Sequence, residues 1–467
     1  MSSKLSRRDF LKIAGATAAS ATIGAPLNRL SPLGNPARKL NADAVTVTFT
    51  GWGAIEEDLG VQEAVKQFES EQSAVKVKWQ QIPDVPQGTY TQTFITNLAA
   101  GTPPDTAFIM SDVYQTFIQQ GVLLDITEKI KADPLLSKPD YFIEPQEQNR
   151  STDGKGHWFG IGSTWVAPHI YYNADVLAKA KVKAPGFKDD EIWDWDTFVA
   201  NAKQLTVDSA GKHPDDSGFN KDDIQTWGVL WPMWWVPLIS AVYANGGEYF
   251  DKGGSVVKLD SPEAMDAIQK LADLIYVLHV SPDAGAMTSL GMTYTQMLES
   301  GRLAMAIDGS WALSFNYKIK APLGVGALPK MKIAASLMQA HFHGALAKTK
   351  NPDAAWQWLR FLNTPFYQTH FCKIGLWVPS QTAMLTPEGM KGWMVKGVHP
   401  DNYADFVSLY LPKHGIVPNF PPGYLEASTK FLYPAMGDIG NGTAIDKVLP
   451  AAVKSANEVL AKAASKA

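Results

Sequence analysis

From residue 45 onward the sequence alternates between two hydrophobic periods, and this alternation constrains the fold more than any other feature. Short stretches with a period of two predict strands, and the stretches between them have the spacing of amphipathic helices. The expected strands are residues 45–50, 75–79 and 106–110, and the expected helices between them are residues 57–71 and 90–100. Strands that alternate with helices predict a doubly wound α/β sheet, in which ligands bind beyond the carboxyl ends of the strands.

The chain is longer than a single hydrophobic core usually supports. It has 467 residues, of which 45% are hydrophobic and 19% are charged, as in ordinary globular proteins. Chains of this length usually divide into more than one unit, so we expect two lobes. Further helices are expected at residues 194–205, 261–278, 353–363 and 444–463, the last interrupted or kinked near Pro450.

Charge is distributed unevenly along the chain. Residues 1–44 contain seven Lys or Arg and two Asp or Glu, whereas the rest of the chain contains 35 basic and 44 acidic residues. Because the chain after residue 44 has this excess of acidic residues, it does not favour binding to the negatively charged backbone of a nucleic acid. We therefore expect no nucleic-acid partner. The single cysteine, Cys372, excludes an intrachain disulfide.

The N-terminus reads SRRDFLK at residues 6–12, followed by a short apolar stretch rich in Ala, Gly and Thr. This pattern resembles the twin-arginine export signal, and the triplet at 42–44 resembles a signal-peptidase site. We therefore expect residues 1–44 to be a signal peptide and spacer. The mature chain would reach the periplasm or the cell exterior, and would stay at the membrane if the signal is uncleaved. The alternative is an amphipathic N-terminal helix that remains in place.

Several motifs follow in a recognisable order. They are LAAGTPPD at 98–105, GVLLDIT at 121–127, YYNADVLAK at 171–179, WDWDTF at 193–198 and the segment from Gly301 to Trp311. In this order they resemble the extracellular solute-binding proteins of carbohydrate-importing ABC transporters, the class that includes maltose-binding protein. The resemblance runs from about residue 45 to the C-terminus and includes the proline-rich segment 417–421.

The resemblance implies a periplasmic-binding-protein type II fold, in which two α/β lobes are joined by a hinge of crossing strands and close on a ligand in the cleft between them. The matching segments predict hinge crossings near residues 163–168, 326–330 and 376–379. Lobe one would comprise residues 45–165 plus 329–376, and lobe two residues 167–327 plus 378–467. The resemblance also implies an ABC permease as partner, a monomeric state and no cofactor.

A sugar needs two kinds of binding partner, and the sequence offers both. Its C–H face packs on aromatic rings, and its hydroxyl groups bind carboxylates, amides or imidazoles. The candidate ligand-binding residues are Trp52, Asp112, Trp165, Trp231, Trp234, Trp311, His343, Trp377 and Tyr424. Trp52 and Asp112 follow expected strands, where a doubly wound sheet places its ligands. Trp52 could instead be a loop residue packed on the lobe surface, Trp311 and Trp165 could pack in a core, and Asp112 could be a helix N-cap.

His341 and His343 lie two positions apart and would face the same way on a strand. Two histidines with no Cys or third His nearby do not make a metal site, so we expect no metal. His343 is a candidate ligand for a sugar hydroxyl, with an ordinary solvated or hydrogen-bonded histidine as the alternative.

Residues 231–238 read WPMWWVPL, with three tryptophans in five positions. Pro232 prevents a regular helix start, and the run is too short to span a membrane. We expect Trp231 or Trp234 to face the cleft and Trp235 to pack in the core.

The leading interpretation is a binding protein without catalytic activity. The sequence has no G-x-S-x-G, H-E-x-x-H, P-loop or complete dinucleotide-binding motif. We expect the extracellular or periplasmic solute-binding component of an ABC importer, which binds a sugar or oligosaccharide by lobe closure. The alternatives are an exported polysaccharide-degrading enzyme, whose two carboxylates can be distant in sequence, and a binder of a non-sugar solute.

Overall fold

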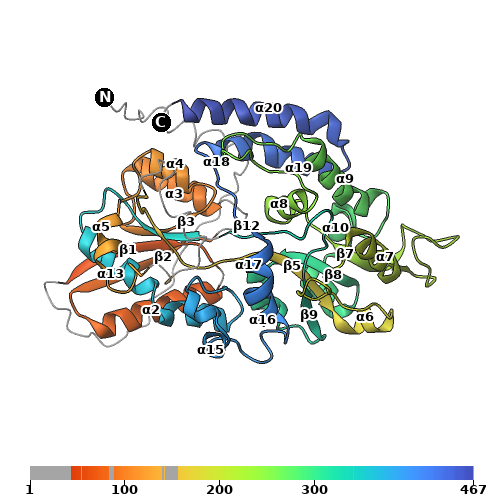
Figure 1. The fold of residues 1–467 in the computed structure, drawn as a ribbon, viewed down its shortest axis with the longest axis horizontal. Coiled ribbons are helices and arrows are strands. Elements are labelled where there is room, and N and C mark those ends of the chain that lie inside the picture. The colour runs from red at the N-terminus through yellow and green to blue at the C-terminus, as the bar shows by residue number, and fades with distance from the viewer. Residues whose placement is uncertain are drawn as a thin grey trace, which may run out of the picture.

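The structure of the protein is a computed structural model that describes residues 44–53, 55–83, 89–138, 141, 156–339 and 341–465. Two five-stranded sheets form the centres of two lobes, which lie side by side along the long axis of the molecule (Figure 1). The lobe-one sheet has, in spatial order, β2 (Val75–Gln81), β1 (Val45–Gly51), β3 (Thr106–Met110), β11 (His341–Ala345) and β4 (Ile161–Gly162).

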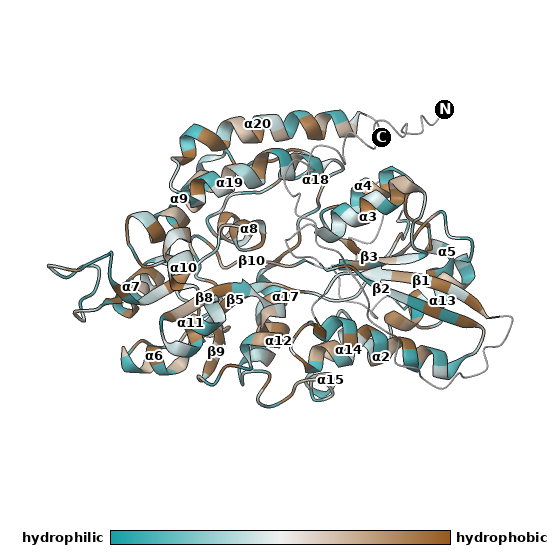
Figure 2. Cartoon of the chain, turned by 180° about the vertical axis from the view of Figure 1, so that it is seen from behind, coloured by the Kyte–Doolittle hydropathy of each residue, from teal (hydrophilic) through white to brown (hydrophobic). Residues whose placement is uncertain are grey.

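In the lobe-one sheet the first three strands in sequence are parallel, as their alternation with helices predicts. β1 is parallel to β2 and to β3, whereas β11 is antiparallel to both β3 and β4. The surrounding helices are α2 (Ile55–Glu71), α3 (Thr89–Ala100), α4 (Tyr114–Gln119), α5 (Thr127–Ala132), α13 (Pro352–Leu362) and α14 (Pro365–Lys373). α3 and α4 cover one side of the sheet, and α2 and α14 cover the other (Figure 2).

The lobe-two sheet mixes parallel and antiparallel pairs. Its strands are, in spatial order, β6 (Val207–Asp208), β7 (Ile224–Leu230), β8 (Leu303–Gly309), β5 (Pro168–Asn173) and β9 (Leu323–Gly326). β7 and β8 are parallel, and β5 is antiparallel to its neighbours β8 and β9. The helices of this lobe include α6 (Ala174–Lys179), α7 (Trp195–Leu205), α8 (Trp235–Ala244), α9 (Pro262–Tyr276), α10 (Ala284–Leu290), α11 (Tyr294–Ser300) and α12 (Leu313–Asn316).

Three chain segments meet at the hinge between the sheets. The first connects β4 to β5, and its Trp165 N–H donates to the carbonyl oxygen of Val378 at 3.0 Å. Val166 in the same segment exchanges backbone hydrogen bonds with Gln339. The three strands of the hinge are therefore held together by their backbones at one place.

The second crossing lies later in the chain than the predicted 326–330. Lys330 and Lys332 donate backbone hydrogen bonds to Trp193 and Ala244, which keeps this segment on lobe two. The chain then forms β10 (Ser336–Leu337), which pairs with β12 (Gly415–Ile416), and reaches lobe one only at β11. The spacing of the motifs did not predict the later position of this crossing, because β12, the strand with which β10 pairs, is remote in sequence.

The C-terminal part adds a group of helices above the space between the lobes (Figure 1). They are α18 (Tyr424–Ala427), α19 (Tyr433–Gly440) and α20 (Ile445–Ala464), and α20 is continuous through Pro450; α17 (Leu411–His414) lies lower, near the middle of the molecule. Two π-helical turns, η4 (Phe406–Tyr410) and η5 (Ser428–Leu432), each end two positions before a proline. Because Pro412 and Pro434 have no N–H to donate, the helix widens before each of them.

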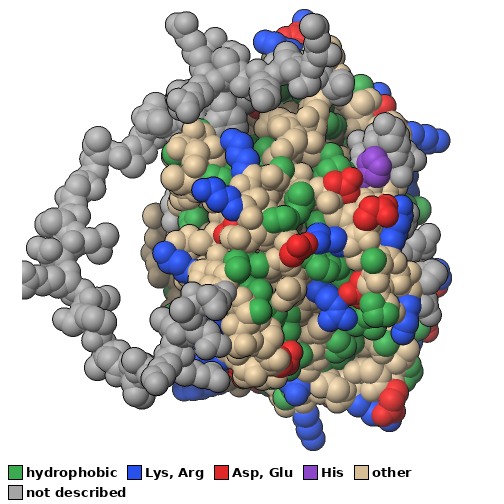
Figure 3. All heavy atoms as spheres, turned by 90° about the vertical axis from the view of Figure 1, so that its left-hand side faces the viewer, with side chains coloured by type: hydrophobic (Ala, Val, Ile, Leu, Met, Phe, Trp, Pro, Cys, Tyr) green, Lys and Arg blue, Asp and Glu red, His purple; other side chains and the backbone are tan. Residues whose placement is uncertain are grey.

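The surface at the lobe-one end of the molecule carries acidic and basic side chains of mixed sign. Figure 3 shows these charges interspersed with small, separate hydrophobic groups over the described part of that face. Such a mixed surface favours solubility rather than binding to a polyanion.

Candidate cleft between the lobes

Two adjoining cavities lie between the lobes. The outer cavity has a volume of about 1100 Å³ and is lined by α3, by the start of α8 and by the C-terminal helices. The hinge cavity has a volume of about 480 Å³ and is lined by residues next to the three crossing segments. Met110, Asp112, Trp234 and Trp235 line both cavities. The cavities are therefore two compartments of one cleft.

The lobe-one wall of the cleft is built where β1 and β3 end. Trp52 follows β1, and Asp112 follows β3, so the parallel strands deliver both side chains to the same edge. The Trp52 ring is held edge-on, with its centroid 5.1 Å from Tyr90 and 4.7 Å from His341. This packing fixes the ring in place before any ligand binds.

The lobe-two wall brings together two tryptophans from distant segments. Trp234 is the N-cap residue of α8, and Trp311 follows β8. Their ring centroids lie 5.8 Å apart at an interplanar angle of 58°. The two rings form an apolar corner at which the C–H face of a sugar can pack.

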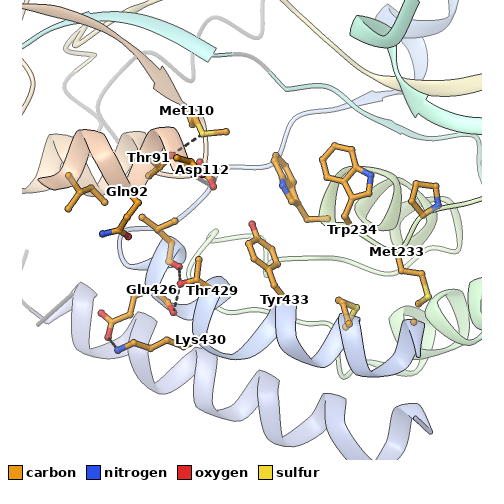
Figure 4. Close-up of a pocket in the computed structure, with 18 of the residues that line it drawn as sticks. Thr91, Gln92, Met110, Asp112, Met233, Trp234, Glu426, Thr429, Lys430 and Tyr433 are labelled. Carbon is orange, nitrogen blue, oxygen red and sulfur yellow. Dashed lines mark hydrogen bonds and ion pairs between the residues drawn. The ribbon is translucent and has the colours of Figure 1, made fainter. Parts of the chain in front are cut away.

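The outer cavity adds polar groups from both lobes. Figure 4 shows Thr91 and Gln92 of α3 on one side of an open space, with Trp234 and Tyr433 on another. The π-helical turn η5 and the adjoining α18 contribute Thr429, Lys430 and Glu426. Lys430 binds Glu426 at 2.7 Å, so this basic group is partly neutralised. Burial raises the pKa of Tyr433 well above its usual range, which keeps its hydroxyl group protonated and able to donate.

The hinge cavity combines aromatic rings with carboxylates. Trp52, Trp311 and Trp377 line it together with Glu56, Glu57 and Asp112. His341 lies at the same wall, and burial lowers its pKa to about 3, so the imidazole is neutral at physiological pH. Aromatic faces beside hydrogen-bonding oxygens are the two kinds of partner that a sugar requires.

Five of the nine candidate residues line the cleft: Trp52, Asp112, Trp234, Trp311 and Trp377. The other four lie in the hydrophobic cores. They are Trp165, Trp231, His343 and Tyr424, and each is at least 98% buried. The expectation that these four face the ligand is corrected by their packing.

Each of the four buried side chains has a specific core environment. Trp231 contacts α7, with centroids 6.1 Å from Trp195 and 5.7 Å from Phe198. The Tyr424 hydroxyl lies 2.8 Å from that of Tyr249.

The remaining two are buried because of their backbone positions. Trp165 belongs to the central hinge strand, where backbone pairing on both sides directs its ring into the core. His343 is two residues farther from the cleft edge of β11 than His341 and packs against Phe49 and Phe108.

Sequence reasoning missed many of the residues that line the cleft, among them three ring side chains. Trp235 is buried at the start of α8, as predicted for a core residue, yet its ring also borders both cavities. His341 lines the hinge cavity in place of His343. Tyr433 comes from a helix whose position depends on long-range packing. The register of β11 against β3, with His341 opposite Met110, was the signal that could have distinguished the two histidines.

The described residues offer neither a metal-binding cluster nor a membrane-spanning helix. Within the described ranges, no group of three or more His, Cys, Asp or Glu side chains is arranged to hold a metal ion. In the same part of the chain, no helix is both long enough and apolar enough to cross a bilayer.

Comparisons with known proteins agree with this architecture. Residues 4–24 match the twin-arginine translocation signal, and they precede the described residues. An arabinooligosaccharide-binding protein from Halalkalibacterium halodurans is 27% identical over 44% of this chain and 41% of its own length. A maltotriose-binding protein from Pyrococcus abyssi is 23% identical over 62% of this chain and 56% of its own length. The chain therefore spans about half the length of these two relatives.

Solved structures show the same fold at low sequence identity. An ABC substrate-binding protein from Listeria monocytogenes, in complex with cycloalternan, has a TM-score of 0.75 at 19% identity, covering 91% of this chain and 100% of its own. The GacH receptor of Streptomyces glaucescens, solved unliganded and with acarbose, has a TM-score of 0.69 at 17% identity, covering 90% of this chain and 98% of its own.

The family-level match is the most extensive of these sequence comparisons. It covers residues 52–369, which include both sheets apart from β1 and most of the cleft. With its twin-arginine signal, the chain is exported to the periplasm by the twin-arginine route. By this match and by its fold, the chain belongs to the bacterial extracellular solute-binding protein family.

Proposed function

We propose that this protein is the substrate-binding component of an ABC importer and that it binds a neutral sugar or oligosaccharide by closing its two lobes. One observation carries the proposal: aromatic rings from both lobes surround the cleft together with the carboxylate of Asp112. Membership of a solute-binding family and the sugar-binding names of relatives support the same ligand class.

The size of the cleft favours an oligosaccharide over a single sugar. The outer cavity alone, at about 1100 Å³, is slightly larger than the range of roughly 300–1,000 Å³ that is usual for small-molecule pockets. The hinge cavity continues from it and shares the carboxylate and the Trp234 ring. A chain of sugar rings could extend from the hinge into the outer compartment.

The distribution of the cleft residues between the two lobes supports the proposed lobe closure. Trp52 and Asp112 belong to lobe one, whereas Trp234 and Trp311 belong to lobe two. A ligand that contacts both walls binds the closed arrangement more tightly than an open one, and so shifts the protein toward it. A closed, loaded form is what an importer's permease could recognise.

Thermal unfolding with a panel of neutral saccharides tests this proposal. At a hundredfold excess over Kd, a ligand adds about 2.7 kcal/mol to the free energy of unfolding. We expect at least one saccharide to raise the midpoint, with no product detected by chromatography after long incubation. Conversion of that saccharide would favour the polysaccharide-degrading enzyme instead, and no shift with any saccharide would contradict the sugar assignment.

A further inference from the structure

We propose that His341 is a ligand-binding residue whose neutral imidazole forms a hydrogen bond with an uncharged hydroxyl group of the sugar unit in the hinge cavity. This inference rests on the proposed function and deepens it, because it assigns a hydroxyl rather than a carboxylate to the inner end of the ligand.

The backbone fixes His341 at the edge of the cleft. It is the first residue of β11 and lies opposite Met110, the last residue of β3. Its carbonyl oxygen accepts hydrogen bonds from both the N–H and the hydroxyl group of Ser163, each at 3.2 Å. The residue is therefore anchored both to the sheet and to the hinge.

The ring of His341 is packed among aromatic side chains at the wall of the hinge cavity. Its centroid lies 4.6 Å from Phe108, 4.7 Å from Trp52 and 5.2 Å from Trp377. The residue is only 8% exposed, and its Nε2 atom has no hydrogen-bond partner among the described residues. Because Nε2 is enclosed, it cannot itself meet a ligand, and the ring nitrogen that a hydroxyl group in the hinge cavity can reach is Nδ1.

His343 shows why the cavity contact matters. It is fully buried, and both of its ring nitrogens also have no partner within the described residues. Unlike His341, it borders neither cavity and packs against Phe49 and Phe108. Contact with the cleft is therefore what assigns ligand binding to His341, and His343 provides an internal control.

The charges that line the hinge cavity favour an uncharged hydroxyl group of the ligand over a carboxylate. Burial lowers the pKa of His341 to about 3, so its ring has one donor and one acceptor nitrogen at neutral pH. A hydroxyl group also donates and accepts, so it can pair with Nδ1 in either tautomer of the neutral ring. A ligand carboxylate would find no cationic imidazole and would face Glu56, Glu57 and Asp112 in the same cavity. Uronic acids should therefore bind more weakly than the corresponding neutral sugars.

Nitrogen-15 NMR of histidine-labelled protein tests the inference directly. The probe is the neutral saccharide that gives the largest thermal shift with the wild-type protein, and signals are assigned with His341→Gln and His341→Leu. We expect the saccharide to move the ring resonances of His341 and to leave those of His343 unchanged. An unchanged His341 signal at saturation would overturn the inference.

Affinity measurements on the two variants provide an independent readout. We expect His341→Leu to weaken saccharide binding about tenfold, which corresponds to about 1.4 kcal/mol, and His341→Gln to retain part of the affinity because an amide can bond a hydroxyl. Wild-type affinity in His341→Leu would overturn the inference while the proposed function stood. If no saccharide stabilises the wild-type protein, the proposed function itself fails. Should His341→Leu not fold, the wild-type NMR result still decides.

Discussion

Trp231 and Trp234 lie three positions apart in the chain but occupy different environments. Trp231 is buried against α7, whereas Trp234 caps α8 and borders both cavities. Trp231→Ala should lower the free energy of unfolding by about 3–5 kcal/mol, since it empties a core site. Trp234→Ala should keep most of the stability but lose roughly 1.5–3 kcal/mol of saccharide binding. Chemical denaturation and calorimetric titration measure the two effects, and equal losses of stability would contradict this division.

The sequence alone could not show which of these tryptophan rings faces the cleft and which packs in the core. The pattern WPMWWVPL does not indicate which tryptophan ring leaves the start of α8 toward the cleft. That choice depends on Trp195 and Phe198, which come from a different helix and form the site that Trp231 fills. By contrast, Trp52 and Asp112 were predictable, because the end of a parallel strand has the same location in every sheet of this kind.

Asp308 is a buried carboxylate at the end of β8, just before the segment that carries Trp311. Burial raises its pKa to about 6, although the Tyr294 hydroxyl donates to it at 2.6 Å. In the unfolded chain the pKa is about 3.9, so the folded state binds the proton more tightly. The stability of the wild type should therefore fall as pH rises from about 4 to 6, by on the order of 3 kcal/mol from this group.

The variant Asp308→Asn isolates this contribution. We expect it to unfold at a higher temperature than the wild type at pH 7 and to lose that advantage near pH 4. Melting curves of both proteins between pH 4 and 7 give the difference in their unfolding temperatures. The contributions of the other titrating groups cancel in that difference. A variant that is destabilised more at pH 7 than at pH 4 would show that the ionised carboxylate is stabilised by its hydrogen bonds instead.

At the scale of elements, the corner between β8 and the turn that follows it positions a ring of the cleft. A Cβ added to Gly309 would lie 2.0 Å from the Trp311 ring, so the ring covers the glycine directly. Gly309→Ala should displace Trp311 and reduce saccharide affinity several-fold or more, with a smaller effect on folding. Gly285→Ala on α10 is the control, because its nearest new contact is 3.3 Å away. Unchanged affinity in Gly309→Ala would show that the Trp311 ring does not contribute.

The elements themselves were largely predictable, and their long-range placement was not. The predicted helix at 353–363 corresponds to α13 (Pro352–Leu362), and the one at 444–463 corresponds to α20 (Ile445–Ala464). Hydrophobic period and capping residues are local signals, which is why they succeed. The pairing of β10 with β12 depends on a contact between segments that are distant in sequence, and no local pattern indicates it.

At the scale of the whole molecule, one ion pair connects the two lobes at the rim of the hinge cavity. Glu56 at the start of α2 belongs to lobe one, and Lys318 follows α12 in lobe two. The Lys318 Nζ atom lies 2.7 Å from the Glu56 Oε1 atom, and both side chains are partly exposed. The hydrogen bond to Lys318 is the main cause that lowers the pKa of Glu56. If the lobes open and close as we propose, this contact is lost in the open form.

An exposed ion pair contributes about 0–1 kcal/mol, which is small for folding but sufficient to change the balance between open and closed forms. We expect Lys318→Met to lower saccharide affinity up to about fivefold at low salt and to leave the unfolding midpoint nearly unchanged. The effect should shrink at high salt, because the screening length falls from about 10 Å at 0.1 M to about 3 Å at 1 M, close to the separation of the exposed pair. Titration calorimetry at two ionic strengths measures it. At a pH below the pKa of Glu56, the wild type should bind the saccharide no more tightly than Lys318→Met, since the protonated acid no longer attracts Lys318.

Two further variants separate closure from a general charge effect. Lys131→Met removes a lysine that pairs with Glu128 inside α5, so it changes the net charge equally without touching the contact between lobes. It should leave affinity and salt dependence as in the wild type. Exchanging the charges in Glu56→Lys with Lys318→Glu should recover part of the affinity, although Glu56 also borders the hinge cavity. If Lys318→Met and Lys131→Met behave alike, the ion pair has no role in closure, and the lobes are held together by the ligand and the hinge alone.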